Sequence, residues 1–444
     1  MRVVVLILLS ALVSACRGDC RSLNAGKVPP TPEDPPLVCP LVLPQDVYGG
    51  ERAACAFGAG ATSEQTLGLP TQLGRELPIR HVIVVMKENR SFDHLLGRLH
   101  EQGQPDTEGV PASFTNPGPN GELVSPARAR STCMGFDPAH QWDAMHEGIH
   151  AGAMDGFVKS AAKTTLTDGH DAMSFYDEAE LPFTTWLAKT FALNDRHFAS
   201  VRSGTLPNRL FLLSGTNDGA RETSLGVTGK ASTPTLMQAL EQAGLTWAAY
   251  SDGELLGGSL GWNVNHPGCY CESEFFERLE TGTLPNVVFI DGVPDYEDDH
   301  PPADLQRGEA WLRAIYEGVV RSPQWPRTAM IFTYDEGGGF ADHVPPPESA
   351  CVARPGTVDD QYFELGVRVP FVVISPYAKP RYVSHVVQEH TAVTRFIETL
   401  FGLPALTARD ANSTALLDLF DFSSCTPPLL NPPEPPASGS GGCR

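Results

Sequence analysis

Basic residues are scarce in this chain of 444 residues. It contains 32 Lys and Arg against 53 Asp and Glu, which gives a formal net charge of −21 at pH 7. Nucleic-acid binders depend mainly on Lys and Arg side chains that face phosphates, so this balance argues against nucleic acid as a partner. An anionic substrate would need a local positive centre, such as a metal ion or a group of Arg side chains.

The chain also lacks the paired CxxC spacing of a zinc site and an apolar run that would comfortably span a membrane. Residues 3–12 are apolar but short; they follow Arg2 and precede small residues, as in a secretory signal. The sequence Val13-Ser14-Ala15-Cys16 is typical of a bacterial lipobox, which predicts lipidation of Cys16 and anchoring to a membrane. Plain secretion with cleavage nearby is the alternative. In an exported chain the ten cysteines are expected to form disulfides.

No internal repeat is evident, and regular patterning is weak at both ends of the chain. After the signal of residues 1–16, residues 17–77 are rich in Pro and Gly, which is typical of a tether. Residues 426–444 form a second Pro-, Gly- and Ser-rich stretch that we expect to be disordered. The folded domain is therefore predicted to span residues 78–425.

Strand-like and helix-like runs alternate between these ends. The expected strands are 81–86, 246–250, 286–290, 329–333 and 370–374, and the expected helices include 183–193, 234–243, 304–320 and 390–400. This alternation predicts an α/β fold, a three-layer α/β/α sandwich whose central sheet is mostly parallel. Such sheets bind ligands at the carboxyl ends of their strands, where polar side chains follow several of these runs.

Two strand ends carry the most informative side chains. Glu88 and Asn89 follow the strand at 81–86, and Asp335 and Glu336 follow the strand at 329–333. Carboxylate and amide oxygens suit a divalent cation. The alternative is an ordinary turn in which Asn89 or Ser91 caps the next helix and the acidic pair is solvated.

Further polar residues near these ends are candidates for a substrate pocket. Asp342 and His343 follow the glycine turn after Asp335-Glu336, and Asp252 follows the strand at 246–250. His343 is equally compatible with a loop histidine bonded to the backbone.

A hydroxyl group precedes another expected helix. Pro207 holds the preceding residue extended, so Thr205 lies in a constrained turn at a helix N-terminus, where backbone N–H groups attract anions. Beside a metal ion this hydroxyl could attack phosphorus. Ser203 is the nearest competitor, and a plain turn residue is the simpler interpretation.

Histidines give weaker signals. His300 lies in an Asp-Asp-His-Pro-Pro segment, either an exposed acidic loop or a proton donor with its carboxylate. His140 lies among polar and aromatic residues, compatible with a pocket wall or a plain loop. His390 opens the helix at 390–400, where capping is the simple explanation.

Taken together, these segments resemble the bacterial phosphoesterases that comprise acid phosphatases and non-haemolytic or plant-type non-specific phospholipases C. The resemblance runs from about residue 80 to about residue 422, through HVIVVMKENRSFDHLLG, TLPNRLFLLSG, LPNVVFIDG, DDHPPADLQRGEAWL, TYDEGGGFADHVPP, GVRVPFVVISPYA and EHTAVTRFIE. It implies a fold related to alkaline phosphatase and makes residues 78–425 a phosphoesterase catalytic domain.

The resemblance also implies site residues. Glu88, Asn89, Asp335 and Glu336 are similar to ligands of one divalent metal ion, and Thr205 to a nucleophile that also touches the metal. His300 is similar to a catalytic histidine near the leaving group, and His140 to one that faces the phosphate. Many relatives have Asp-Glu-His-Gly-Gly, whereas this chain has Gly337 in place of the histidine.

These implications predict an exported, metal-dependent phosphoester hydrolase that acts through a phospho-threonine intermediate. Phospholipase C-type cleavage of phospholipid headgroups is the preferred reaction, and hydrolysis of small phosphomonoesters by an acid phosphatase is the alternative. A catalytically inactive surface lipoprotein is a remote third reading. Calcium, magnesium, manganese and iron suit oxygen-rich ligation almost equally. Residues 255–262 are a candidate interfacial loop or a plain glycine-rich connection.

Overall fold

The central element of the fold is a mixed sheet of eight strands. The computed structural model describes residues 39–165, 167–222, 234–252, 269–347, 351 and 364–437. The strand order is β13-β6-β12-β11-β1-β10-β8-β9. The strands are β1 (His81–Lys87), β6 (Ala192–Asn194), β8 (Trp247–Tyr250), β9 (Cys269–Tyr270), β10 (Val287–Ile290), β11 (Thr328–Tyr334), β12 (Phe371–Ile374) and β13 (Val383–Ser384).

Most neighbours in this sheet are parallel, as the alternation of strands and helices predicts. β11, β1, β10, β8 and β9 pair in parallel, whereas β12 is antiparallel to both β11 and β6. Every residue of β1 and β11 is buried, which explains why these strands are nearly continuous apolar runs. Their carboxyl ends lie side by side at one edge of the sheet.

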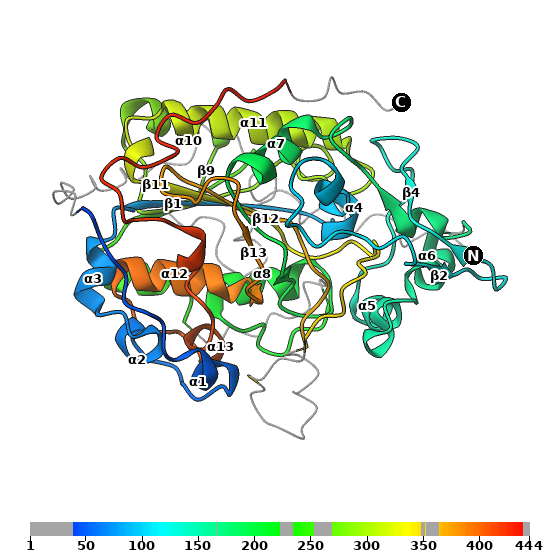
Figure 1. Cartoon of the computed structure of the whole chain (residues 1–444), viewed down its shortest axis with the longest axis horizontal. Helices are drawn as coiled ribbons and strands as arrows, with labels where there is room; N and C mark the ends of the chain where they lie inside the picture. The colour runs from blue at the N-terminus through cyan, green and yellow to red at the C-terminus, as the bar shows by residue number, and fades with distance from the viewer. Residues whose placement is uncertain are drawn as a thin grey trace, which may run out of the picture.

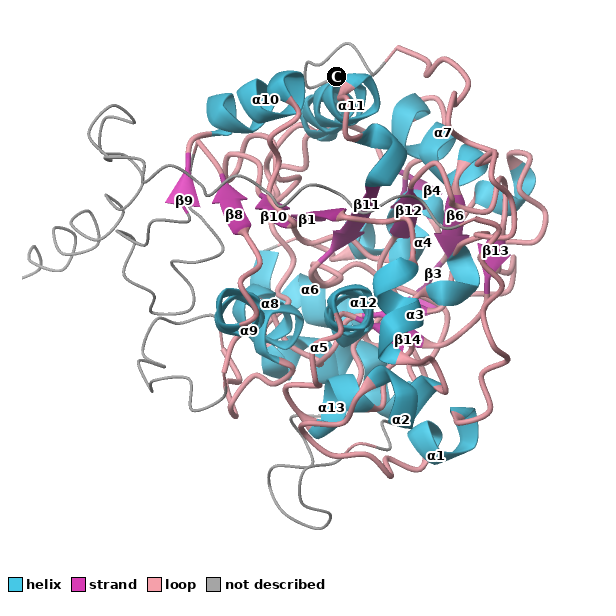
Figure 2. Cartoon of the chain, turned by 90° about the vertical axis from the view of Figure 1, so that its left-hand side faces the viewer, coloured by secondary structure: helices cyan, strands magenta, loops and turns pink. Residues whose placement is uncertain are grey.

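Helices cover both faces of the sheet, so the expected three-layer α/β/α architecture is confirmed. Figure 2 shows one layer of helices above the strands and another below them. The upper layer contains α7 (Pro182–Thr190), α10 (Glu272–Thr281) and α11 (Leu305–Arg321); the lower one contains α3 (Thr71–Glu76), α8 (Thr205–Ser214), α9 (Leu236–Gln242) and α12 (Thr391–Phe401). In the described residues no helix is long and apolar enough to cross a membrane.

One predicted helix is too long. The run at 183–193 was expected to be helical throughout, but the helix ends at Thr190 and Phe191 is extended. Residues 192–194 form β6, because Leu193 pairs with Val372 on one side and with Val383 on the other. Pairing on both edges outweighs the local helical pattern.

Smaller elements gather at the carboxyl end of the sheet and below it. Figure 1 shows α4, α5 and α6 at the end towards which β1 runs. The remaining elements are α1 (Gly49–Ala53), α2 (Ser63–Leu67), α4 (Phe92–Leu96), α5 (Trp142–Ile149), α6 (Phe157–Thr165), α13 (Ala408–Ala411), β2 (Asn116–Pro117), β3 (Leu123–Val124), β4 (Ala127–Arg128), β5 (Ser174–Phe175), β7 (His197–Phe198) and β14 (Gln388–Glu389), with short 3-10 turns between them.

The folded body extends past the expected boundaries at 77 and 425. Residues 39–77 form α1, α2 and α3, and a Cβ atom on Gly74 would lie 2.4 Å from the Thr399 carbonyl oxygen, so α3 packs tightly on α12. Leu429 is buried, and its backbone N–H donates to the Pro376 carbonyl at 3.1 Å. The apolar side chains within these Pro- and Gly-rich stretches keep them on the core. Residues 1–38 and 438–444, with Cys16 among them, lie outside the described part.

Disulfides hold both end segments in place. Cys39 pairs with Cys425 and Cys55 with Cys351, and Cys133 and Cys271 are also disulfide-bonded. The expectation of disulfides is therefore confirmed for these six cysteines.

Candidate active site

The two acidic segments follow β1 and β11, the two central strands of the sheet, and lie side by side at its carboxyl edge. Because β1 and β11 are parallel neighbours, Glu88-Asn89 and Asp335-Glu336 leave the sheet at the same edge. The backbone N–H of Asn89 donates to Asp335 Oδ1 at 3.3 Å. Asn89 has a φ of +65°, a left-handed conformation that Asn tolerates better than most residues. The structure thus brings together the four residues expected to hold a metal ion.

A buried guanidinium joins these carboxylates to a third strand end. Arg209 donates through Nε to Asp335 Oδ2 at 3.0 Å and through Nη1 to Asp291 Oδ1 at 3.0 Å. Its Nη2 donates to Glu88 Oε1 at 3.2 Å. Asp291 directly follows β10, on the other side of β1. Sequence reasoning missed Arg209, although its position four residues after Thr205 was a usable signal.

Thr205 begins the helix that carries this guanidinium. Residues four apart on a helix share a face, so Thr205 lies on the side of α8 from which Arg209 reaches Glu88 and Asp335. The turn before the helix is fixed by Asn208, which accepts from Val201 N–H at 2.9 Å and donates to Ser203 O at 2.9 Å. The competitor Ser203 is buried, and its hydroxyl donates to the Arg221 carbonyl.

His140 contacts two of the candidate ligands. Its Nδ1 lies 2.8 Å from the Pro138 carbonyl, so Nδ1 carries the proton and Nε2 is free to accept. That Nε2 lies 3.3 Å from Asn89 Nδ2 and 3.9 Å from Glu336 Oε1. The bond fixes the Asn89 amide with its nitrogen towards the histidine, which leaves Oδ1 for another partner.

His300 lies beside His140, on a loop held by the same strand ends. The two rings are 5.9 Å apart between centroids. His300 Nδ1 lies 2.7 Å from the Pro301 carbonyl, which leaves Nε2 facing Asp137 Oδ2 at 3.9 Å. The structure therefore places both predicted catalytic histidines near the strand ends.

Buried contacts of Asp299 hold this loop. Lys87, the last residue of β1, forms an ion pair with Asp299 at 2.6 Å, and both side chains are less than 5% exposed. The Tyr334 hydroxyl donates to the same carboxylate at 2.5 Å, and Arg90 Nη2 donates to the Asp299 carbonyl at 2.6 Å. Sequence reasoning missed Lys87 and Tyr334, although a Lys at the end of a nearly apolar strand was a visible signal. The Asp298-Asp299 pair was expected only as an exposed acidic loop or as the carboxylate beside a proton donor.

Burial, and then the negative charge of neighbouring carboxylates, raise the pKa of several carboxyl groups at the site. Burial raises the pKa of Glu88 to about 7 against the attraction of Arg209. Burial and then Asp335 raise the pKa of Glu336 well above its usual range. Burial and then Glu88 raise the pKa of Asp298 to about 8. The positive charge of Arg209 thus offsets only part of the negative charge of these carboxylates.

The unpaired oxygens of the site fit a divalent cation. Asn89 Oδ1 and Glu336 Oε1 are buried, and neither has a hydrogen-bond partner among the described residues. Leaving such acceptors unpaired is costly, and an added cation would satisfy both while relieving the repulsion between the carboxylates. The donors are hard oxygens, which matches the chemistry expected from the sequence.

Comparison with known proteins identifies the family. The model of the phosphoesterase family matches residues 79–404. The chain belongs to the phosphoesterase family. Non-specific phospholipase C1 of Arabidopsis thaliana is 30% identical over 391 residues, covering 75% of this chain and 69% of the relative. Phospholipase C B of Mycobacterium tuberculosis (strain CDC 1551 / Oshkosh) is 30% identical over 443 residues, covering 85% and 83%.

The solved structures that it resembles are more distant. A protein of the alkaline phosphatase superfamily from Vibrio parahaemolyticus has a TM-score of 0.38 and 11% identity, covering 72% of this chain and 77% of that one. A phosphonate monoester hydrolase of Agrobacterium radiobacter has a TM-score of 0.39 and 11% identity, covering 77% of both. The family match makes the protein a hydrolase of phosphoester bonds; phosphoesterases of this family depend on a metal ion.

Three candidate pocket residues of the phosphoesterase have other partners. His343 Nδ1 lies 2.7 Å from Asp93 Oδ2, and Arg368 donates to Asp93 at 2.8 Å and to Asp342 at 2.9 Å. Burial raises the pKa of Asp342 to about 6 despite Arg368. Asp252 is exposed and accepts from the Glu272 N–H at 3.0 Å, at the start of α10. The loop at 255–262 lies outside the described residues.

The glycine turn of the phosphoesterase brings its ligand segments into contact. Gly338 has a φ of +62°, and a Cβ there would lie 2.2 Å from the Asn89 carbonyl oxygen. A Cβ on Gly339 would lie 2.6 Å from the Ala139 carbonyl oxygen, next to His140. A Cβ on Gly337 would lie 2.3 Å from Val367 Cγ2, so there is little space for a side chain at this position.

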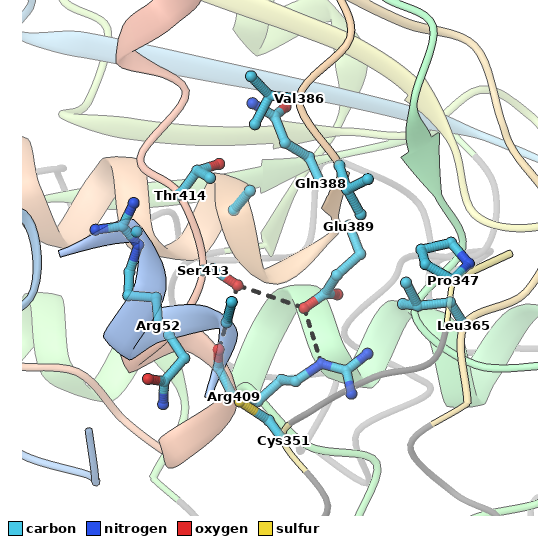
Figure 3. A pocket seen from close by; sticks show the side chains of 15 residues that line it. Arg52, Pro347, Cys351, Leu365, Val386, Gln388, Glu389, Arg409, Ser413 and Thr414 are labelled. Carbon is cyan, nitrogen blue, oxygen red and sulfur yellow. Dashed lines mark hydrogen bonds and ion pairs between the residues drawn. The ribbon is translucent and has the colours of Figure 1, made fainter. Parts of the chain in front are cut away.

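A separate cavity lies below the sheet. Figure 3 shows this cavity, of about 480 Å³, beside Glu389, whose carboxylate accepts from Arg409 Nε at 3.0 Å. Arg409 and hydrogen bonds from Ser200 and Thr391 lower the pKa of Glu389 against the effect of burial. The next residue, His390, places Nε2 2.7 Å from the Asp335 carbonyl, which gives it a structural contact beside the active site.

Proposed function

We propose that this phosphoesterase is a phospholipase C that cleaves the headgroup from a phospholipid through a phospho-threonine intermediate. The observation that supports the proposal is the set of contacts between Arg209 of α8 and the carboxylates at the strand ends. Arg209 binds Glu88 and Asp335, and Thr205 begins the same helix one turn earlier. This arrangement supports the assignment of Thr205 as a nucleophile that acts beside the candidate metal ligands.

The residues that would hold the metal ion are Glu88, Asn89, Thr205, Asp335 and Glu336. When bound there, a divalent cation lowers the pKa of the Thr205 hydroxyl and neutralises charge on the phosphoryl oxygens. The unpaired Asn89 Oδ1 and Glu336 Oε1 support this assignment. Calcium, magnesium, manganese and iron are all compatible with these oxygen donors.

The side chains have distinct roles in the proposed reaction. Thr205 Oγ1 attacks phosphorus in line with the leaving oxygen, and the backbone N–H groups at the start of α8 receive the phosphate. The Thr205 hydroxyl gives its proton to water as it attacks. The bond from phosphorus to the leaving oxygen breaks, and His300, which takes up a proton on Nε2 from solvent beforehand, gives that proton to the leaving oxygen. Water then hydrolyses the phospho-threonine and regenerates the Thr205 hydroxyl. His140 faces the phosphate and holds the Asn89 amide in position.

A phospholipid substrate is supported by the relatives of about 30% identity, whose names describe phospholipases C. The leaving group would then be diacylglycerol. An acid phosphatase acting on small phosphomonoesters would use the same nucleophile and metal site, so the substrate has to be measured.

The test is an assay with phosphatidylcholine and with a chromogenic phosphomonoester, each with added metal and with chelator. We expect metal-dependent release of diacylglycerol. Release only from the phosphomonoester would make the protein a phosphatase, and no release from either would refute the catalytic assignment.

Variants test the nucleophile. Thr205→Ala should lose turnover while keeping its folding and most of its metal binding, because four other ligands remain. Ser203→Ala should retain most turnover because its hydroxyl is already bonded to the Arg221 carbonyl. Trapping of radiolabelled phosphate on wild type but not on Thr205→Ala would support the covalent intermediate. Full activity in Thr205→Ala would overturn it.

We also propose that the protein is exported and anchored through a lipidated Cys16. The disulfides Cys39–Cys425 and Cys55–Cys351 support an oxidising compartment. Metabolic labelling with palmitate and membrane fractionation of wild type and Cys16→Ser would test it. A soluble, unlabelled wild-type protein would contradict the anchor.

A further inference from the structure

We propose that the cavity between α1, α13 and β14 is a second binding site, which takes an uncharged amphiphile with hydroxyl groups, such as a short-chain acylglycerol. Its volume of about 480 Å³ lies within the range of about 300–1,000 Å³ that is usual for small-molecule pockets. The described lining contains none of the candidate metal ligands or catalytic residues. Binding at this site is therefore independent of the proposed reaction.

The lining of the cavity differs from one side to the other. Figure 3 shows the polar side chains of Thr414, Ser413 and Arg52 on one side and the apolar side chains of Pro347 and Leu365 on the opposite side. A molecule that fills this space meets hydrogen-bonding groups along one edge and carbon atoms along the other. An amphiphile suits both sides, because each part of it is buried against groups of its own kind.

The charged side chains of the described lining are already paired. Arg409 Nε donates to Glu389 Oε1 at 3.0 Å. Arg52 Nη1 donates to Asp46 Oδ1 at 2.9 Å. A charged ligand would have to break one of these pairs or be buried beside them without a counter-charge, and both are costly. The cavity therefore favours a ligand that carries no net charge.

Two buried oxygen atoms of the lining have no hydrogen-bond partner among the described residues, namely Gln388 Oε1 and Thr414 Oγ1. Gln388 is 3% exposed, and its Nε2 donates to Asp418 Oδ1 at 3.2 Å, which fixes the amide with Oε1 as an acceptor. A ligand hydroxyl can donate to Gln388 Oε1, and a second hydroxyl can donate to or accept from Thr414 Oγ1. Hydroxyl groups therefore suit the polar side of the cavity.

Apolar side chains of the lining also reach the protein surface. Val386 is 38% exposed and Val387 is 46% exposed, and both belong to the lining. Exposed aliphatic side chains beside a cavity provide an apolar path along which an acyl chain can leave it, and the chain would then remove their surfaces from water. The two valines therefore support a ligand whose apolar part is an alkyl or acyl chain.

The test measures binding of 1-octanoylglycerol to the purified full chain by calorimetry, below the concentration at which this lipid forms micelles. The control ligands are octanoate, which has the same chain but a charged head, and glycerol, which has the hydroxyl groups but no chain. We expect 1-octanoylglycerol to bind at least about 10-fold more tightly than either control, since burial of two methylene groups already accounts for such a factor. No binding of 1-octanoylglycerol would overturn the site. Equal affinity for octanoate or for glycerol would overturn the class of ligand.

Two tryptophan variants locate the bound lipid. Ala53 is exposed and belongs to the lining, so the indole of Ala53→Trp would occupy part of the cavity without being forced into the core. Affinity for 1-octanoylglycerol should fall by about 10-fold or more as contacts of the chain are lost. The matched control is Ala54→Trp, at the neighbouring exposed position outside the described lining, which should bind like wild type. Urea midpoints check that both variants are folded. Equal affinity of Ala53→Trp and wild type would overturn the location.

A change at Thr414 tests the polar contact. Thr414→Val keeps the shape of the side chain but removes its hydroxyl, so affinity should fall by about 2- to 10-fold, the usual net contribution of one hydrogen bond. Thr414→Ser keeps the hydroxyl and should retain most of the affinity. Equal affinity of Thr414→Val and wild type would contradict this contact.

Thr205→Ala separates the cavity from the active site. This variant should bind 1-octanoylglycerol like wild type, and loss of binding in it would place the lipid in the active site and overturn the proposal. A protein that binds 1-octanoylglycerol in the cavity but hydrolyses no phosphoester would refute the proposed function alone.

Discussion

Replacement of Arg209 by methionine tests the charge balance of the active site. The change keeps much of the side-chain volume but removes the guanidinium from Glu88, Asp291 and Asp335, which lie 3.0–3.2 Å from its nitrogens. Arg209 is 5% exposed, so solvent screens these pairs little. Breaking a buried ion pair usually costs about 3–5 kcal/mol, because the remaining charges are left uncompensated.

We therefore expect the free energy of unfolding of metal-free Arg209→Met to fall by about 3–5 kcal/mol relative to metal-free wild type. Divalent cation should restore part of this loss, because it neutralises the same carboxylates. A ligand at 100 times its dissociation constant adds about 2.7 kcal/mol to any protein that binds it only when folded. The gain in Arg209→Met should exceed the gain in wild type.

The assay is urea unfolding of both proteins with chelator and with saturating metal. Arg368→Met is the matched control, since Arg368 is equally buried and pairs with Asp93 and Asp342 but with none of the candidate ligands. It should be destabilised without this extra recovery. An unchanged stability of Arg209→Met, or equal recovery of the two variants with metal, would refute the reasoning.

Three further predictions concern the surroundings of the site. Lys87→Met leaves the buried Asp299 carboxylate without its ion-pair partner, although Tyr334 still donates to it. The free energy of unfolding, measured with urea, should fall by about 3–5 kcal/mol, and kcat should fall in steady-state kinetics because the His300 loop is misplaced. Gly338→Ala should lose metal affinity in calorimetry because its Cβ has no space, whereas Gly121→Ala, also at positive φ but with open space around it, should lose only about 1–2 kcal/mol of stability. Burial, and then Arg90, hold the pKa of His94 well below its usual range, so the unfolded state binds a proton that the folded state does not. The free energy of unfolding should therefore fall as the pH drops below about 6.5. A urea midpoint of wild type that stays constant from pH 8 to pH 5 relative to that of His94→Gln would contradict this.

The layers of the fold were predictable because its core strands have a simple pattern. β1 and β11 are buried along their whole length, so their sequences are continuous apolar runs that stand out from the helices. The antiparallel direction of β12 was not predictable, because a buried strand has the same composition in either direction. The end of α7 was misjudged because the pairing of β6 with β12 and β13 depends on residues about 180 positions later.

The residues of the candidate site were likewise predictable only in part. Strand ends and the family resemblance indicated Glu88, Asn89, Asp335 and Glu336, and the structure places them together. Residues that act through long-range pairing could not be assigned from local sequence. Arg209 looks like an ordinary residue of a helix until three strand ends converge on it.

The disulfide between Cys39 and Cys425 makes the folded body a covalently closed ring. Its cysteines are 386 residues apart, and closing a loop of that length removes on the order of 6 kcal/mol of chain entropy from the unfolded state. A single cut by a protease between residues 39 and 425 would open the ring without separating its pieces. A nicked molecule would therefore migrate as one species on a non-reducing gel, and the strand ends on either side of the cut would stay covalently linked.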